Sequence, residues 1–177
     1  MSNFNFSGKC WVAGDYIPTD QIIKADRVFL PMAEAAKFVL EDDNPEFGKH
    51  VAPGDILVAG KHFGQSSGRA VAVKALIATG ISCLVAESFA RTFYRNAFEV
   101  GLPILEAPGI RAAITQGDQL HVDLPGGTVT VLRTGQVIKG NPIPAFLLEM
   151  LSGGGLIAVA PQLIEKDNEA RSGNTQS

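Results

Sequence analysis

Residues 56–86, ILVAGKHFGQSSGRAVAVKALIATGISCLVA, decide the fold. The apolar run Ile56–Ala59 has the length of a strand, and a turn rich in glycine and serine joins it to the alanine-rich stretch Ala70–Thr79, whose composition favours a helix. Gly80 stands where a helix would end, and Ile81–Ala86 is a second continuous apolar run. This order of strand, loop, helix and strand predicts two buried parallel strands joined by a right-handed crossover.

The segments around this unit extend the same pattern. Ser88 is placed to cap a helix over Phe89–Val100 that Gly101 ends, and Leu102–Leu105 is expected to form the next strand. Near the start of the chain, Lys9–Ala13 is expected to form another strand. These segments predict a parallel core covered by helices.

The rest of the chain predicts other elements. Met32–Leu40 has apolar residues at helical spacing, and Pro144–Leu151 is expected to form a short helix. After Pro108 the pattern changes, because His121–Leu124 and Thr128–Leu132 are rich in β-formers and flank a Pro-Gly-Gly turn, which is typical of a hairpin. The sequence therefore predicts an α/β fold with an antiparallel β addition.

Composition limits the class of protein. The chain has 177 residues, 46% of them hydrophobic and 19% charged, as in an ordinary globular domain, and residues 1–165 are expected to form one domain followed by a polar, disordered tail over 166–177. The net charge of −3 and the lack of a Lys/Arg-rich run argue against nucleic acid as a partner. No apolar run approaches the roughly 20 residues that span a bilayer, and no basic-then-apolar leader is visible at the N-terminus, so a cytoplasmic location is expected.

Two cysteines and one histidine need an explanation. Cys10 and Cys83 lie in apolar segments without a Cys-x-x-Cys motif or a Cys/His cluster, which predicts buried, reduced thiols and no metal site. Two thiols alone do not hold an iron–sulfur cluster, which normally takes three or four. His62 directly precedes the glycine- and serine-rich turn and is interpreted as a structural or surface histidine.

The turn Gly64–Arg69 is the first candidate site. It precedes a predicted helix, where free backbone N–H groups and the helix dipole attract anions, and Arg69 adds a planar cation that suits a carboxylate or phosphate. Ser66 and Ser67 bring two hydroxyl groups to the same turn. The turn lacks the nucleotide-binding P-loop pattern and the nucleophile-elbow pattern, and a purely structural connector between strand and helix is an equal alternative.

Arg91 and Arg95 form the second candidate site. They are four residues apart and share one face of a predicted helix that starts at the carboxyl end of a parallel strand, where ligands usually bind in open α/β sheets. The alternative is a solvated basic stripe, or ion pairs with Glu87 and Glu99.

A third candidate combines Asp15 with Thr19 and Asp20. Two carboxylates in one loop can orient an arginine or bind a metal ion. Aspartate and threonine are also the residues that cap helices, and capping is the preferred interpretation of this group.

Five longer motifs, in the right order, indicate a family. The sequence resembles the 3-isopropylmalate dehydratase small-subunit family, which is similar to the swivelling fourth domain of aconitase, and the likeness covers about residues 10–160. Its first motif is Gly-Asp-x-x-x-Thr-Asp-x-Ile-Ile, and the motifs match Gly14–Ile23, Pro53–Gly64, Ser88–Asn96, Gly101–Pro103 and Gly154–Leu156. The resemblance implies a swivelling β/β/α domain.

The resemblance also implies a function. It points to a hydro-lyase active only with a large subunit, in a heterodimer whose large subunit carries a [4Fe–4S] cluster, so this chain itself would bind no cofactor. Ser67 would take the proton alpha to a carboxylate, and Arg69 would bind a substrate carboxylate. Asp20 would line the site and Arg27 lies where the substrate-sensing loop begins. Ser66 and Gly68 are expected to contact substrate, and Thr19, Arg91 and Arg95 are expected to support the site.

The chain departs from the family pattern within the turn. Where the family has Gly-Ser-Ser-Arg-Glu, this chain has Ser66-Ser67-Gly68-Arg69-Ala70. The substrate is therefore left open between isopropylmalate, as in leucine biosynthesis, and homoaconitate, citramalate or a dimethylmalate-like acid. A non-catalytic anion-binding module is the alternative from another class. Whether the isolated subunit self-associates is also left open.

Overall fold

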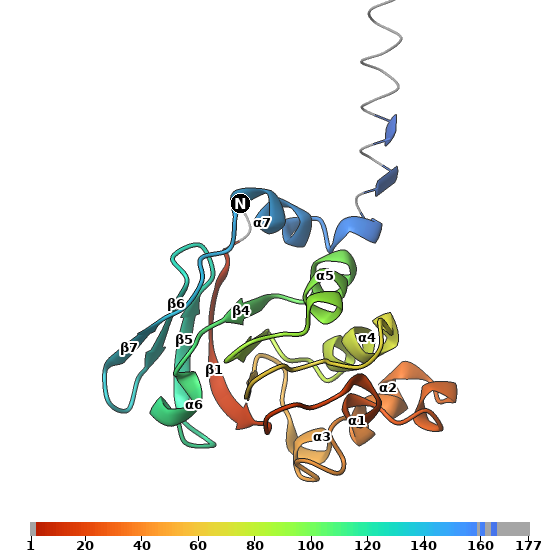
Figure 1. Cartoon of the computed structure of the whole chain (residues 1–177), viewed down its shortest axis with the longest axis horizontal. Helices are drawn as coiled ribbons and strands as arrows, with labels where there is room; N and C mark the ends of the chain where they lie inside the picture. Colours follow the sequence, from red (N-terminus) through yellow and green to blue (C-terminus); the bar gives the residue numbers. More distant parts are fainter. Residues whose placement is uncertain (1–2, 159, 162–163, 166–177) are drawn as a thin grey trace, which may run out of the picture.

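The computed structural model describes residues 3–158, 160–161 and 164–165, and its strands form one seven-stranded sheet in the order β4-β3-β2-β1-β5-β6-β7 (Figure 1). The strands are β1 Asn5–Val12, β2 Ile56–Ala59, β3 Cys83–Ala86, β4 Ile104–Glu106, β5 Gln119–Asp123, β6 Thr128–Val131 and β7 Gln136–Lys139. The α-helices are α1 Thr19–Ile22, α2 Met32–Ala35, α3 Phe47–His50, α4 Ala70–Ala78, α5 Arg91–Val100, α6 Ile110–Ala113 and α7 Ala145–Ser152. Two short 3-10 helices are η1 Arg27–Phe29 and η2 Ala36–Phe38.

The first half of the sheet, β1 to β4, is parallel. Every residue of β2 and β3 is buried, which explains why both read as continuous apolar runs rather than as alternating patterns. Helix α4 connects β2 to β3 and α5 connects β3 to β4, so both predicted strand–helix units are confirmed.

The second half of the sheet, β5 to β7, is antiparallel, and β1 belongs to both halves. Residues Asn5–Lys9 pair with β5 in antiparallel register, while Cys10–Val12 pair with β2 in parallel register. The predicted hairpin corresponds to β5 and β6. Strand β7, where only Ile138 is buried, was not predicted from the sequence.

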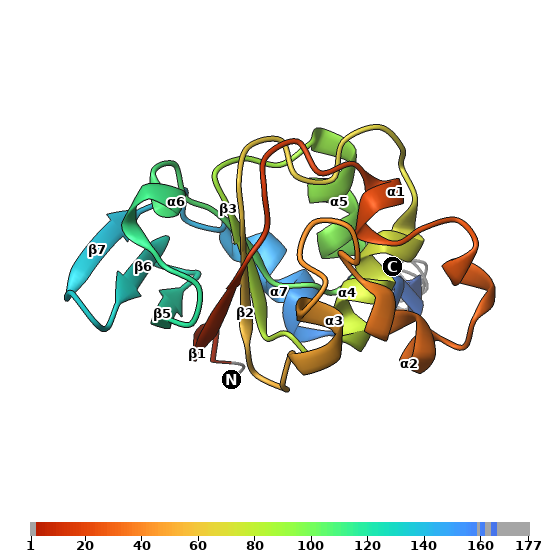
Figure 2. The ribbon, with the colours of Figure 1, turned by 90° about the horizontal axis from the view of Figure 1, so that it is seen from below.

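The elements form layers. Figure 2 shows the antiparallel strands on one side, the parallel strands in the middle, and α1 to α5 with α7 on the other side. Buried side chains from both halves of the sheet belong to one hydrophobic cluster. The predicted α/β class with a parallel strand–helix core and an antiparallel addition is confirmed.

Several local predictions need correction. The helix expected over Met32–Leu40 consists of α2 and η2, and Leu40 has a positive φ of 58°, which no α-helix continues. Ser88 does not cap α5, which begins at Arg91, because its hydroxyl accepts a hydrogen bond from the backbone N–H of His62 instead. Both cysteines are buried and free, as expected. The predicted tail over 166–177 lies outside the described residues.

Candidate functional site

Three loops meet at the carboxyl edge of the parallel strands and run together along the upper edge in Figure 2. They are residues 13–18 after β1, 60–69 after β2 and 87–90 after β3. The middle loop is hydrogen-bonded to both neighbours, because the Gly64 N–H donates to the Ile17 carbonyl at 2.8 Å and the Phe63 N–H donates to the Ser88 carbonyl at 3.1 Å. The candidate turn is therefore part of a braced edge and not an isolated connector.

Aromatic packing fixes the start of the turn. Gly64 has a φ of 84°, and a Cβ built on it would lie 2.3 Å from a ring atom of Phe93. Phe93 is buried and packs edge-on against Phe63, with ring centroids 5.3 Å apart, and stacks on Phe89 at 5.9 Å. Only glycine fits between the turn and this aromatic cluster.

Ser67 is held by a hydrogen bond from another loop. Its Oγ lies 2.7 Å from the Oγ1 of Thr19, which is buried in α1. The preferred interpretation of Thr19 as a helix cap is wrong, because α1 has Pro18 at its N-cap and no side-chain cap bond. The threonine hydroxyl contacts the candidate base instead.

The two carboxylates of the same segment have different surroundings. Asp20 is exposed in the first turn of α1. Asp15 accepts a hydrogen bond at 2.8 Å from the backbone N–H of Lys61, so it braces the neighbouring loop and caps no helix. Among the described residues, no three His, Cys, Asp or Glu side chains come together as metal ligands.

Arg69 ends the turn as the N-cap residue of α4, and its side chain is exposed. No carboxylate of the described residues pairs with it. The residue before it is fixed on α5, because the Asn96 side-chain amide donates to the Gly68 carbonyl at 3.1 Å. The guanidinium group is thus free to bind an anion beside the N-terminus of a nine-residue helix.

The turn departs from the family pattern at Ser66, Gly68 and Ala70, and the backbone bears on the first two of these positions. Ser66 is exposed and has a φ of 87°, a left-handed conformation that a glycine adopts without strain. Gly68 lies so close to α5 that a Cβ on it would be 2.9 Å from the Cγ2 of Thr92. A second serine at position 68 would therefore press on the helix.

Arg27 has partners within its own segment. Its guanidinium group contacts Glu41, with the Nη2 atom 3.3 Å from a carboxylate oxygen, and lies 4.0 Å from the centre of the Phe38 ring. Both contacts hold η1 beside the segment 38–41.

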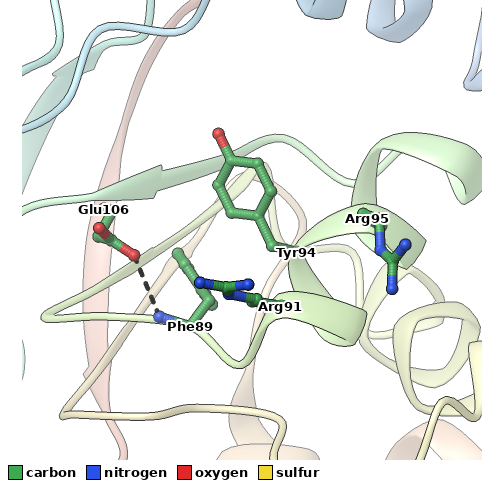
Figure 3. A pocket seen from close by; sticks show the side chains of 5 residues that line it. All are labelled: Phe89, Arg91, Tyr94, Arg95 and Glu106. Carbon is green, nitrogen blue, oxygen red and sulfur yellow. Dashed lines mark hydrogen bonds between the residues drawn. The ribbon is translucent and has the colours of Figure 1, made fainter.

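Arg91 and Arg95 line a separate pocket of about 420 Å³ together with Phe89, Tyr94 and Glu106 (Figure 3). None of these residues belongs to the Ser67 turn. Glu106 accepts a hydrogen bond at 3.2 Å from the backbone N–H of Phe89. Burial, and secondarily the charge of Glu106, raises the pKa of the Tyr94 hydroxyl. The pocket therefore combines two cations, one fixed carboxylate and an aromatic wall.

The proposed ion pairs of these arginines with Glu87 and Glu99 are not formed among the described residues. The Glu87 carboxylate instead accepts hydrogen bonds from the backbone N–H groups of Gly109 and Arg111. Sequence reasoning missed Tyr94 and Glu106 as pocket residues. For Glu106 a signal existed, because it directly follows the apolar run Leu102–Leu105 and ends β4 at the edge of the sheet where ligands bind.

Comparison with known proteins shows the family. The model for the aconitase C-terminal domain matches residues 34–108. The small subunit of an isopropylmalate/citramalate isomerase from Methanocaldococcus jannaschii is 45% identical over 165 residues, which cover 93% of this chain and 96% of the relative. The chain belongs to the 3-isopropylmalate dehydratase small-subunit family. A member from Pyrobaculum calidifontis, named 3-isopropylmalate dehydratase small subunit, is 50% identical over 85% of this chain and 93% of its own length.

Solved structures agree with this family and its fold. The crystal structure of a 3-isopropylmalate dehydratase from Methanocaldococcus jannaschii has a TM-score of 0.83 and 32% identity, and the match covers 93% of this chain and 99% of that one. Aconitase X from Thermococcus kodakaraensis has a TM-score of 0.52 at 13% identity, which shows a shared fold alone. No helix in the described part of the chain is long and apolar enough to cross a membrane.

Proposed function

We propose that this chain is the small subunit of a two-subunit hydro-lyase of the isopropylmalate dehydratase type, and that it takes part in leucine biosynthesis. The enzyme would isomerise a hydroxy di- or tricarboxylic acid by dehydration and rehydration. One observation carries the proposal: the Ser67 hydroxyl, 2.7 Å from that of Thr19, lies in the same turn as Arg69, which forms no ion pair with the described residues. Their separation of two residues in one turn supports a hydroxyl base and a carboxylate-binding cation that act on the same substrate.

The proposal divides the site between two chains. Because the described residues bring no cluster of metal ligands together, they do not fit a [4Fe–4S] cluster, and we assign that cluster to a large subunit. The curated relatives of this chain are themselves named small subunits. This chain would supply the protein wall that binds substrate and moves the proton.

Ser67 would receive the proton from the carbon alpha to a substrate carboxylate, onto its Oγ. A serine hydroxyl has a very high intrinsic pKa, so its alkoxide needs donors that stabilise it. Thr19 provides one, since its Oγ1 lies at hydrogen-bond distance and is held in a buried position. The N-terminus of α4, which begins three residues further along the chain, would add a favourable dipole.

Arg69 would bind a substrate carboxylate through its planar fork of N–H donors. Ser66, Gly68 and Asp20 would line the site beside it. Arg91 and Arg95 would contribute positive potential from the neighbouring pocket. In Arg27 the guanidinium is already engaged by Glu41, so a role in substrate binding requires that this ion pair opens.

The test is a set of matched variants of the chain, co-expressed with the large subunit and assayed by the absorbance of the alkene intermediate. Ser67→Ala should lower kcat by about 10²- to 10⁴-fold, the usual contribution of a positioned general base. Thr19→Val should lower kcat, while Thr19→Ser, which keeps the hydroxyl, should retain most of it. Arg69→Lys should raise KM more than it lowers kcat. Wild-type turnover in both Ser67→Ala and Arg69→Ala would contradict the assignment.

One observation favours a second substrate. The Methanocaldococcus jannaschii relative is named for both isopropylmalate and citramalate. We therefore propose citramalate as the alternative substrate, with homoaconitate and dimethylmalate-like acids as further members of the test panel. The ratio of kcat/KM values across the panel identifies the substrate. A wild-type complex that turns over none of these acids would favour the non-catalytic anion-binding module.

A further inference from the structure

Two exposed aromatic side chains form a stacked pair on neighbouring loops of the carboxyl edge. The rings of Tyr16 and His62 are 5.9 Å apart between centroids, with an interplanar angle of 18°. Tyr16 is 54% exposed and His62 is also exposed. The pair therefore presents a flat aromatic surface to solvent.

Both residues occupy the left-handed backbone region, which is uncommon for residues other than glycine, asparagine, aspartate and histidine and is strained for a bulky residue such as Tyr16. The φ angle is 57° at Tyr16 and 50° at His62. Ser66, in the same loop as His62, has a φ of 87°. Strain of this kind persists only where the surrounding structure enforces it, and it concentrates at functional sites.

The surrounding hydrogen bonds do enforce it. The Tyr16 N–H donates to the Lys61 carbonyl at 2.7 Å, and the Tyr16 carbonyl accepts from the Gln65 side-chain amide at 3.0 Å. The His62 N–H donates to the Ser88 hydroxyl at 2.9 Å. Because both rings are exposed, burial in the core does not explain why the chain holds them in these conformations.

The pair stands at the rim of the Ser67 site. Tyr16 is three residues before Thr19, and three residues of fully extended chain span at most about 11 Å. Gln65, which bonds Tyr16, is two residues before Ser67. Short segments of chain thus join the pair to both residues of the Thr19–Ser67 contact.

We propose that the stacked pair Tyr16–His62 is an anchor on which the large subunit docks. This rests on the proposed function, which places the other half of the site on a second chain that must cover this edge. Rigid, exposed aromatic side chains lose little conformational entropy on binding and are enriched among the residues that dominate interface energies. The complementary surface of the large subunit would offer an apolar or aromatic contact to the flat faces of the rings.

The test uses asparagine, which tolerates the left-handed backbone conformation, so that the rings are removed without a loss of backbone fit. The double variant Tyr16→Asn/His62→Asn should bind the large subunit at least tenfold more weakly than wild type in a direct measurement of Kd, with no fall in the melting temperature of the isolated chain. Tyr16→Phe should retain the affinity. Leu132→Asn removes an exposed apolar side chain just after β6 and should leave Kd unchanged.

An unchanged Kd in the double variant would overturn the inference while leaving the proposed function standing. An equal loss of affinity in Leu132→Asn would also overturn it, because the effect would not be specific to the rim. If the wild-type chain binds no cluster-bearing large subunit, both the inference and the proposed function fail. The Kd of wild type thus separates the two failures.

Discussion

Replacement of Gly64 by alanine tests whether close packing against α5 fixes the site turn. A Cβ at this position would lie 2.3, 2.4 and 2.5 Å from three atoms of Phe93. Phe93 is 1% exposed and packed between Phe63 and Phe89, so its ring has no space into which it can move. The turn must move instead, and Ser67 moves with it.

The expected loss of stability has two parts. A side chain in the left-handed conformation costs about 1–2 kcal/mol. Overpacking of a well-packed core adds about 1–3 kcal/mol. Gly64→Ala should therefore lower the free energy of unfolding by about 2–5 kcal/mol, and each kcal/mol should lower the melting temperature by about 2–4 °C for a chain of this size.

Gly54→Ala is the matched control. Gly54 has a φ of 92°, close to the 84° of Gly64, but nothing lies within 4 Å of the position of its Cβ. Urea unfolding of both variants separates the two parts, because the control reports the backbone cost alone. Equal losses of stability in Gly64→Ala and Gly54→Ala would refute the packing argument.

Three further predictions concern other positions. Gly68→Ser should lower the free energy of unfolding by about 1 kcal/mol, the usual cost of a strained side-chain contact. The second substitution Thr92→Ser removes the opposing methyl group and should restore most of this loss. Equal losses with and without Thr92→Ser would contradict the prediction. The Arg133 guanidinium lowers the pKa of Asp118 to about 2, so this pair stabilises the fold above about pH 4 and ceases to do so as the pH falls toward 2. Asp118→Asn should therefore lower the urea midpoint at pH 7, and the difference from wild type should vanish near pH 2. Burial raises the pKa of the Cys83 thiol, so DTNB should label it in urea and not in the native protein, and fast native labelling would show that it is accessible.

The central fold was predictable because its signals are local. In β2 and β3 both faces are buried, which gives uninterrupted apolar runs, and the alanine-rich sequence of α4 has few alternatives to a helix. Strand β7 was not predictable in this way. It is an edge strand with a single buried side chain, Ile138, so its pairing with β6 depends on the tertiary fold and not on its own pattern.

The candidate site was predictable in composition and not in its contacts. The turn sequence indicates an anion site, and the family resemblance assigns a role to Ser67. The contact between Ser67 and Thr19 joins residues 48 positions apart, which no local pattern reports. The helix-cap propensity of threonine predicted that Thr19 would cap α1. Its hydroxyl instead forms a partly buried hydrogen bond with Ser67 in the turn.

The shared strand β1 also sets an order of assembly. Its residues Cys10–Val12 can pair with β2 once Ile56–Ala59 have emerged from the ribosome, whereas Asn5–Lys9 have no partner until Gln119–Asp123 have emerged. During synthesis the parallel half of the sheet can thus form while the backbone N–H and C=O groups of Asn5–Lys9 are still exposed to water. For that interval the first residues of the chain are an open sheet edge, and a slow or stalled ribosome prolongs the time during which another nascent chain can pair with it.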